Sequence, residues 1–235
     1  MQGHTRLVTW NCNHQLGRKL GKLLELAPDV AVIQECERDL DVPEGFVFHW
    51  VGDNPRKGLG VLSRDSEAVI ESARDEAWTY FLPVRLPAMN LRLLATWAFN
   101  FRAQKKFGEG RTGNAWDVIS ALSEWLQSGP SLVAGDFNNN VNWDTARGRY
   151  NFADIVDVCS RLGLRSAYHA YTGEALGAES QPTFLHTKNP AKPFHIDYCF
   201  ASRALAIHSF RVEPFDPWLR ESDHVPLILD LGSAS

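Results

Sequence analysis

Short apolar runs of the length of a β-strand recur along the whole sequence, and they limit the folds that the chain can adopt. They are rich in β-branched and aromatic residues and are separated by turn formers such as glycine, proline and asparagine. Such runs are typical of strands that are buried on one or both faces. We therefore predict strands at residues 6–10, 29–35, 46–51, 58–64, 91–99, 131–137, 195–202 and 225–231.

Amphipathic stretches of helical length lie between several of these runs. Their apolar residues are three and four positions apart, which predicts helices that cover the sheets, at 16–26, 115–126 and 152–162. Strands and helices do not alternate strictly, because 46–99 reads as consecutive strands joined by polar turns. This order favours an α+β fold with antiparallel or mixed sheets. Two loop-like stretches, 172–191 and the shorter 108–113, are expected to face a substrate.

The composition is that of a folded protein, with 44% hydrophobic and 22% charged residues among 235. A chain of this length can form one large core, so we expect one domain over residues 1–235. The formal net charge of −4 gives no overall attraction to polyanions, and any binding of nucleic acid must rely on local charge or on metal ions. The four cysteines lie far apart and form no CxxC pair, which indicates buried reduced thiols.

The N-terminal stretch contains no basic region followed by a long apolar segment, so no signal peptide is expected. No apolar segment approaches the roughly 20 residues that cross a bilayer. From these features we expect a cytoplasmic protein, without membrane insertion, that is a monomer.

Five polar clusters share one placement, at or just after the end of a predicted strand. Carboxylates and amides at the rim of buried strands are costly to desolvate unless they bond to a metal, a ligand or one another. Each cluster alone is a weak signal, since an aspartate or asparagine after a strand commonly forms a turn or caps a helix. Together they indicate convergence on one site. The clusters are 10–13, 34–35, 135–138, 195–198 and 222–224.

The residues of these clusters, and their order along the chain, resemble the sequence motifs of the endonuclease/exonuclease/phosphatase superfamily. The resemblance extends over nearly the whole chain, from Thr9 to Leu227. That superfamily includes apurinic endonucleases, pancreatic-type deoxyribonucleases, neutral sphingomyelinases and inositol-polyphosphate 5-phosphatases. The Gly-Asp-Phe-Asn stretch at 135–138 and the Ser-Asp-His-Val-Pro stretch at 222–226 are the most specific; the other matching motifs are Thr9-Trp10-Asn11, Ile33-Gln34-Glu35 and Ile196-Asp197-Tyr198. The resemblance implies a four-layer αββα sandwich with two central mixed β-sheets and a site at one end of the sheets.

The resemblance also implies a hydrolase that acts on phosphoric esters with the help of a divalent cation. A phosphodiester is anionic and repels an incoming hydroxide, so a hard cation with oxygen ligands is needed to neutralise charge. Glu35 is the best candidate ligand, and Asp223 adds a second carboxylate. The amide oxygen of Asn11 or Asn13 could complete the protein's share of the ligands. Oxygen ligands favour Mg²⁺ or Mn²⁺ over zinc.

His224 is expected to approach the phosphate, as a general base for water or as a charged stabiliser. Asp197 would bond to the other ring nitrogen and fix the orientation of the ring. By analogy with the family, Asp136 contacts the attacking water or transfers a proton. Asn138 and Asn11 would hold the nucleophile and the non-bridging oxygens. The residues leave open which group finally accepts the proton.

One position departs from the family pattern. Trp97 stands where many relatives carry a histidine or a tyrosine, so a second phosphate-contacting or acid group is unassigned, with His186 and Tyr150 as alternatives. For any single tryptophan near the motifs, core packing is favoured over contact with substrate. We predict substrate contacts, by phosphate binding or by aromatic stacking, for Asn100, Arg102, Arg111, Trp97 and Trp143.

The leading interpretation is a divalent-metal-dependent phosphodiester hydrolase of the nuclease type, acting on DNA or RNA. A phosphomonoesterase, or a phosphodiesterase for phospholipids or inositol phosphates, is the main alternative. A third interpretation is a non-catalytic binding module on the same fold, although such a module has no chemical reason to keep every central acid, amide and histidine. The fold alone does not choose a substrate.

Overall fold

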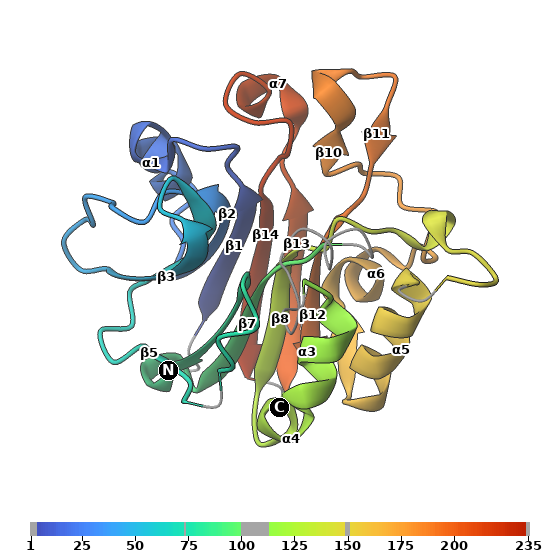
Figure 1. Ribbon diagram of the computed structural model, residues 1–235, viewed down its shortest axis with the longest axis horizontal. Coiled ribbons are helices and arrows are strands. Elements are labelled where there is room, and N and C mark those ends of the chain that lie inside the picture. The colour runs from blue at the N-terminus through green and yellow to red at the C-terminus, as the bar shows by residue number, and fades with distance from the viewer. Residues whose placement is uncertain (1–3, 73, 100–112, 149–150, 234–235) are drawn as a thin grey trace.

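Two six-stranded β-sheets pack against each other in the computed structural model, which describes residues 4–72, 74–99, 113–148 and 151–233 (Figure 1). In spatial order the first sheet consists of β13 (Leu205–Val212), β14 (Leu227–Ser233), β1 (Thr5–Asn11), β2 (Val30–Cys36), β4 (Lys57–Ser63) and β3 (Val47–Asn54). The second consists of β5 (Val69–Ile70), β6 (Phe81–Leu86), β7 (Leu91–Trp97), β8 (Ser131–Asp136), β12 (Asp197–Ser202) and β9 (Leu164–Ser166).

Each sheet has one parallel pair at its centre, and its remaining neighbours run antiparallel. The parallel pairs are β1 with β2 and β7 with β8. A parallel pair needs a crossover connection, and the crossovers here are helical. The first passes through α1 (Leu16–Leu24), and the second through α3 (Ala115–Ala121) and α4 (Ser123–Gln127). The predicted α+β fold with two mixed sheets is therefore confirmed.

Helices cover the outer face of the first sheet. The apolar residues of α1 recur at helical spacing, so that one face of the helix is buried in the core. On the same side lies the short helix α7 (Phe215–Trp218), whose Trp218 packs edge-on against Trp10 of β1 with the ring centres 5.0 Å apart. The side chains of α1 that are buried in this way are Leu16, Leu20 and Leu23.

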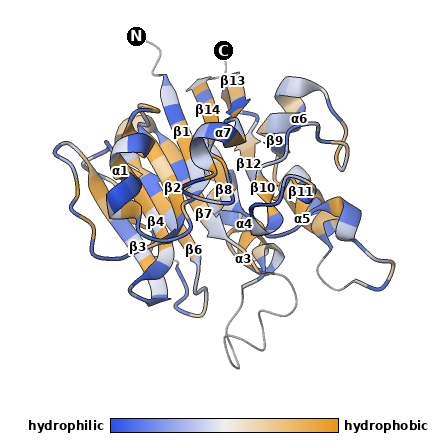
Figure 2. Cartoon of the chain, turned by 90° about the horizontal axis from the view of Figure 1, so that it is seen from above, coloured by the Kyte–Doolittle hydropathy of each residue, from blue (hydrophilic) through white to orange (hydrophobic). Residues whose placement is uncertain are grey.

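The second sheet is covered by α3, α4 and α5 (Phe152–Arg161), which form a hydrophobic core of their own with it. Phe152 of α5 packs on Tyr198 of β12 with the ring centres 4.5 Å apart, and Val118 of α3 is buried in the same cluster. A larger core fills the space between the sheets. Figure 2 shows the hydrophobic residues gathered on the strands of both sheets. The predicted four-layer αββα sandwich is confirmed.

Side-chain alternation decides which residues reach the space between the sheets. In β8, Leu132 and Ala134 belong to the core between the sheets, and Asp136 continues the same face at the end of the strand. In β12, Cys199 lies in that core, and Asp197 begins the same face. The carboxylates of Asp136 and Asp197 therefore point toward the first sheet, at one end of the sandwich.

Several elements differ from the prediction. The stretch 115–126 forms two helices that meet at Leu122 instead of one. The edge strand β13 was not predicted, because polar residues interrupt its apolar pattern and a bulge lies between Ile207 and Ser209. The loop-like stretch 172–191 contains β10 (Phe184–Leu185), which pairs with β11 (Pro193–Phe194).

Most of the second predicted loop, 108–113, lies outside the described residues. Of the stretch 108–113, only Gly113 is described. Among the described helices, none has both the length and the hydropathy to span a bilayer. The remaining short helices are α6 (Ala167–Thr172) and the 3-10 helices η1 (Pro87–Met89), η2 (Val141–Trp143) and η3 (His186–Lys188).

All four cysteines are unpaired and buried, as predicted: Cys12, Cys36, Cys159 and Cys199. Burial raises the pKa of Cys12 to about 12, and it also raises the pKa of the other three thiols. A buried thiol with a raised pKa is a poor nucleophile, because the thiolate is the reactive form. The cysteines are therefore packing residues.

Close packing of β7 on β8 predicts that Gly135 cannot be replaced. A Cβ at this position would overlap the backbone oxygen of Thr96, so Gly135→Ala should lower the free energy of unfolding by about 1–3 kcal/mol. Gly21, which is exposed inside α1 with no atom near its added Cβ, is the matched control. Gly21→Ala should raise stability by roughly 0.5–1 kcal/mol. Urea denaturation measures both, and equal stability of the two variants would contradict this packing.

Candidate active site

Asn11 ends β1 and joins acidic residues of both sheets. The residue is 3% exposed. Its Nδ2 donates to Oδ2 of Asp136 at 3.0 Å and lies 3.4 Å from Oε1 of Glu35. Its Oδ1 accepts from the backbone N–H of Asn13 at 3.1 Å and keeps a second lone pair. One amide therefore links β2 of the first sheet to β8 of the second.

A β-bulge directs Glu35 toward this amide. The pairing of β2 with β4 shifts register between Gln34 and Cys36, and Glu35 adopts a φ of 60°. The left-handed conformation costs on the order of 1 kcal/mol for a residue with a Cβ, and bulges near functional sites commonly redirect a side chain. The carboxylate is 17% exposed, and its Oε2 lies 2.9 Å from Nζ of Lys57 and 3.4 Å from Nε2 of His14.

Asp136 and Asp197 are direct partners in the antiparallel pair of β8 and β12, so their buried carboxylates lie on the same face of the sheet. Asp136 accepts from the backbone and side-chain nitrogens of Asn138 at 2.8 and 3.1 Å. Asn138 has a φ of 48°, and this turn brings its amide back over Asp136. Asp197 accepts from the hydroxyl of Thr183 at 2.6 Å. Two buried carboxylates this close repel each other unless positive charge or a proton compensates them.

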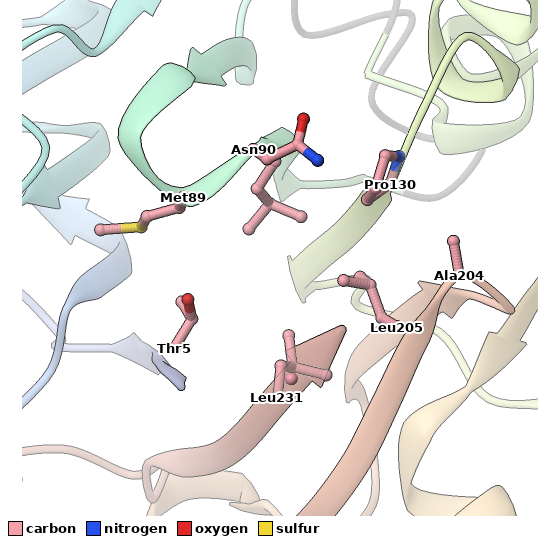
Figure 3. Close-up of a pocket in the computed structure, with 9 residues that line it drawn as sticks. Thr5, Met89, Asn90, Pro130, Ala204, Leu205 and Leu231 are labelled. Atoms are coloured by element: carbon pink, nitrogen blue, oxygen red, sulfur yellow. The ribbon is translucent and has the colours of Figure 1, made fainter. Parts of the chain in front are cut away.

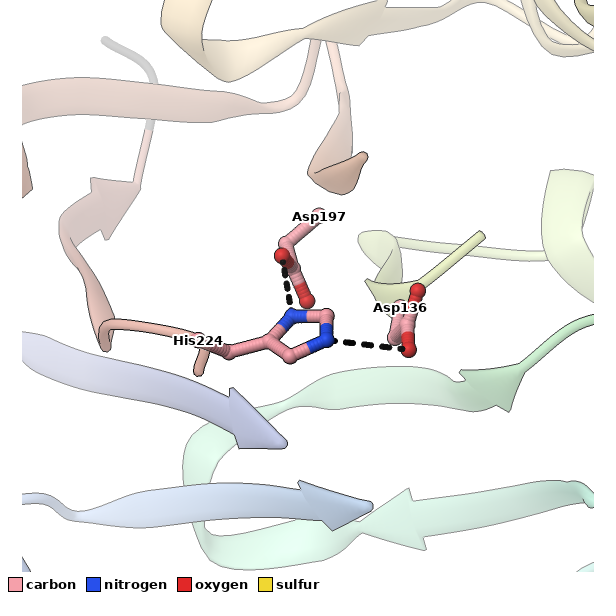
Figure 4. A group of neighbouring side chains, drawn as sticks. All are labelled: Asp136, Asp197 and His224. Carbon is pink, nitrogen blue, oxygen red and sulfur yellow. Dashed lines mark hydrogen bonds and ion pairs between the residues drawn. The ribbon is translucent and has the colours of Figure 1, made fainter. Parts of the chain in front are cut away.

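His224 supplies that compensation from between the two carboxylates (Figure 4). Its Nδ1 donates to Oδ2 of Asp197 at 2.9 Å, and its Nε2 lies 4.0 Å from Oδ2 of Asp136. Ser222 holds the segment in place, because its hydroxyl accepts from the backbone N–H of His224 and donates to the backbone oxygen of Asn11. The end of β1 and the segment before β14 are thereby tied together.

The pKa values of this group follow from its burial and charges. Burial would lower the pKa of His224, but the charge and hydrogen bond of Asp197, with the charges of Asp136 and Asp223, raise it to about 9. Burial raises the pKa of Asp136 to about 7, helped by the charge of Asp197 and opposed by His224 and Asn11. Near neutral pH the site thus holds an imidazolium beside a carboxyl group that can exchange a proton, which suits acid–base chemistry.

The surroundings of Glu35 fit a hard divalent cation. The Asn11 amide, the Lys57 ammonium and the His14 ring converge on its carboxylate, so this is a place where positive charge is already favoured. The donors that the sequence predicted, Glu35 with Asn11 and Asp223, are all oxygens, the ligand type that Mg²⁺ prefers. Asn11 contacts Glu35 through its Nδ2, while its Oδ1, the atom that could bind a metal, accepts from Asn13 and keeps one lone pair. Asp223 lies near enough for its charge to raise the pKa of His224.

A second arrangement could also hold an ion. Ligand atoms of Asp136, Asp197 and His224 lie within 4.8 Å of one another. However, Oδ2 of Asp197 already accepts from both Thr183 and His224, and the Nδ1 of His224 is used in that bond. The His224–Asp197 hydrogen bond and the His224–Asp136 ion pair join these three residues, and we name them the proton-transfer group after the role that the sequence resemblance implies. Glu35, Asn11 and Asp223 stay the predicted metal ligands.

The two tryptophans predicted to contact substrate lie in different environments. Trp143 is 44% exposed and packs edge-on against Phe194, with the ring centres 5.1 Å apart. Trp97 is 2% exposed and packs on Tyr80 and Phe99 at 4.5 and 4.9 Å, so core packing is the role that the structure gives it. Trp143 can present its ring to a substrate, whereas Trp97 cannot do so in this conformation.

Other candidates for substrate contact cannot be placed or lie on the surface. Among the described residues, His186 begins the exposed 3-10 helix η3. The predicted substrate contacts Asn100, Arg102 and Arg111, and the alternative acid Tyr150, lie outside the described residues. Those predictions remain untested.

Three residues near the site were not predicted as site residues. Lys57 and His14 contact Glu35, and Phe184 packs on the ring of His224 with the centres 4.5 Å apart. Thr183, which precedes Phe184, donates to Asp197, so the two neighbours contact both members of the His224–Asp197 pair. Nothing in the local sequence pointed to Lys57, because only the pairing of β2 with β4 brings it to Glu35.

The opposite end of the sheets lacks this chemistry. A cavity of about 50 Å³ opens there, near the start of β1 and the end of β14 (Figure 3). None of its lining residues, all within the described part of the chain, has an ionisable side chain. They are Thr5, Met89, Asn90, Leu91, Pro130, Ala204, Leu205, Leu231 and Gly232.

The contact between His224 and Asp197 predicts an unusual titration. In the metal-free protein, NMR should give His224 a pKa of about 9, and Asp197→Asn should lower that pKa because burial then acts with less opposition. Asp223→Asn is the control, with a smaller decrease. Since the folded-state pKa exceeds the usual value of 6.5, this ionisation stabilises the fold fully below pH 6.5 and loses its effect as the pH rises through about 9. A pKa near 6.5 in wild type and variant alike would contradict the geometry.

Comparison with known proteins identifies a family for part of the sequence. Residues 123–224 match the model of the Endonuclease/Exonuclease/phosphatase family. This stretch contains the Asp136, Asn138, Asp197 and His224 positions described above. No curated protein matches the sequence.

Solved structures with a similar fold cover almost the whole chain. The 3′ phosphatase NExo from Neisseria, bound to a product DNA hairpin, has a TM-score of 0.72 at 18% identity and covers 96% of this chain and 98% of its own. An AP endonuclease from Archaeoglobus fulgidus has a TM-score of 0.67 at 15% identity, covering 96% and 98%. The AP endonuclease LMAP from Leishmania major has a TM-score of 0.68 at 14% identity, covering 98% and 88%.

These findings agree with the resemblance seen in the sequence motifs. The identities are low, so the structural likeness by itself speaks for the fold. The family match covers Asp136, Asp197 and His224, which the fold brings together. Residues 123–224 therefore match the Endonuclease/Exonuclease/phosphatase family in sequence, and nearly the whole chain shares the fold of these solved structures.

Proposed function

We propose that this protein is a divalent-metal-dependent phosphodiesterase that acts on nucleic acid. The observation that carries the proposal is the Asn11 amide, which joins Glu35 to Asp136 and so sets a cation site beside the proton-transfer group. Cleavage of a phosphodiester needs both functions within reach of one phosphorus atom. The DNA hairpin bound to NExo, and the AP endonuclease names of two other structures of this fold, favour DNA as the substrate.

Local features on both sides of the site suit a nucleic acid despite the net charge of −4. On the side of Glu35, a hollow of about 540 Å³ is lined by His14, Arg18 and Arg56, among others. Arginines of this kind can bind backbone phosphates. On the other side, Trp143 and Phe194 line a pocket of about 340 Å³. An exposed ring there can stack on a base or cover a sugar.

The proton-transfer group has separate roles for its members. Asp197 orients His224 and keeps its ring protonated, so that the Nε2 proton can donate to a phosphoryl oxygen as negative charge builds up. Asp136, with a pKa near 7, is the group that can accept a proton from the attacking water. The gap of 4.0 Å between Nε2 and Oδ2 leaves the two groups free to act on different atoms.

The amides position these groups. Asn138 donates to Asp136 and to the backbone oxygen of Ala98, which fixes the direction of the carboxylate. Asn11 holds the opposite side of the same carboxylate. A divalent cation bound at Glu35 would neutralise charge on the phosphate and on the leaving oxygen. We propose Mg²⁺ or Mn²⁺, because the candidate ligands are oxygens.

A second candidate function is removal of a terminal 3′ phosphate. The likeness to the 3′ phosphatase NExo favours it, and the same acid, base and cation would serve a monoester. The two functions differ in what surrounds the phosphate, since a diester must extend past the site on both sides. The hollow at Arg18 and the pocket at Trp143 lie on two sides of the site and so favour the diester.

Activity assays can separate these possibilities. We expect Mg²⁺- or Mn²⁺-dependent cleavage of duplex oligonucleotides that EDTA abolishes, with losses of roughly 100- to 10,000-fold in His224→Gln and Asp136→Asn. Glu35→Gln should raise the metal concentration needed for half-maximal rate. The substrates are a duplex with an internal abasic analogue, one with a 3′-hydroxyl end and one with a 3′ phosphate. Release of phosphate alone would support the second candidate.

The control is His208→Gln, at an exposed histidine of the edge strand β13, which should keep full activity. Circular dichroism and melting temperature establish that every variant is folded. Full activity of folded His224→Gln would show that the proton-transfer group is wrongly assigned. Activity that persists in EDTA would refute the role of the metal.

A further inference from the structure

Lys57 occupies an unusual position beside the candidate metal ligand. It begins β4, directly across from the bulge that redirects Glu35. Its Nζ lies 2.9 Å from Oε2 of Glu35, and 5.3 Å from the centre of the Trp97 ring. The side chain is 32% exposed, so one part of it faces solvent while the ammonium contacts the site. A fixed positive charge thus stands where a divalent cation would also be attracted.

The Trp97 ring is a rigid support for this charge. Trp97 is 2% exposed and packs on both Tyr80 and Phe99. A cation above the face of a tryptophan gains electrostatic attraction, more so where water is partly excluded. Lys57 is therefore held at two points, by a carboxylate and by an aromatic face. This contact also gives a role to Trp97, whose indole is otherwise a core side chain.

Lys57 and a divalent cation cannot both keep full contact with Glu35. The Lys57 ammonium takes one carboxylate oxygen, and the Asn11 amide approaches the other. Two positive charges a few ångströms apart repel strongly in a partly buried site. Nε2 of His14 also lies 3.4 Å from Oε2 of Glu35. The His14 side chain is 43% exposed, so it can move into solvent at little cost. Lys57 is thus the principal competitor for the carboxylate.

We propose that Lys57 is the resident counter-ion of Glu35, that a divalent cation must displace it, and that Lys57 thereby sets the metal affinity of the site. The inference rests on the proposed function, since it takes Glu35 to be a metal ligand. After displacement from Glu35, the Lys57 ammonium stays near the Trp97 ring. From there its positive charge can attract a phosphate oxygen of the substrate. Because Lys57 and the cation compete for Glu35, the site binds the metal more weakly than the same ligands would without Lys57.

Direct metal binding tests this competition without relying on catalysis. Mn²⁺ is titrated into the metal-free protein, and free Mn²⁺ is followed by electron paramagnetic resonance. Lys57→Met, which keeps the length of the side chain without its charge, should bind Mn²⁺ roughly tenfold more tightly than wild type at low salt. Lys57→Gln is a second neutral variant with the same expectation. The gain should shrink as ionic strength rises, because salt screens the repulsion in wild type.

Two further variants serve as controls. Lys57→Arg keeps the charge and should bind Mn²⁺ within about twofold of wild type. Lys22→Met removes a lysine of matching chemistry elsewhere, since Nζ of Lys22 lies 4.5 Å from the Trp218 ring centre and 4.0 Å from a carboxylate oxygen of Glu221. It should leave the Mn²⁺ affinity unchanged. A melting temperature for each variant accompanies the titration.

The outcomes separate this inference from the proposed function. Tighter binding in both neutral variants, with Lys57→Arg near wild type, supports the inference. Mn²⁺ binding that is lost in Glu35→Gln but unchanged or weaker in both neutral variants overturns the inference and leaves the metal site in place. Binding that Glu35→Gln does not weaken overturns both, because the ion then binds elsewhere.

Discussion

The structure of the site depends on the pairing of two buried carboxylates. Asp136 and Asp197 stand opposite each other on neighbouring strands and face the space between the sheets. Their mutual repulsion in a poorly solvated place has to be compensated, and the imidazolium of His224 does so from between them. The raised pKa values of His224 and Asp136 are two results of the same arrangement. Asn11 extends the compensation to Glu35 in the other sheet.

The fold brings these charged side chains together at one end of the sandwich. Each sheet has its parallel pair at the centre, so β1, β2 and β8 end close together where the sheets meet. None of the residues around the small cavity at the other end of the sandwich has an ionisable side chain. The cluster of ionisable residues around Asp136, Asp197, His224 and Glu35 therefore lies at one end of the sandwich.

The backbone around the site is strained. Asn13, His14 and Gln15 follow one another with φ between 48° and 67°, and Glu35 and Asn138 have similar values. Residues with a Cβ take this conformation at a cost, which surrounding contacts have to offset. Here the contacts are those of the site itself, such as the bond from Asn13 to Asn11 and the bond from Asn138 to Asp136. The conformation and the charge pattern of the site thus depend on each other.

The sequence by itself indicated the layered fold and the polar residues that the fold brings together. Apolar runs mark most of the buried strands, and acids or amides at their ends indicated one shared site. The resemblance of the motifs to a known family then implied roles for Asn11, Glu35, Asp136, Asp197 and His224. The edge strand β13 was missed because an edge strand needs no continuous apolar pattern.

Only the tertiary structure decided which of these residues touch and what surrounds them. It placed Trp97 in the core and Trp143 on the surface, although both are tryptophans beside a motif. It also brought Lys57 to Glu35 through the pairing of β2 with β4. The physical reason is that burial and contact between distant residues arise from strand register and sheet packing, which no local pattern of residues records.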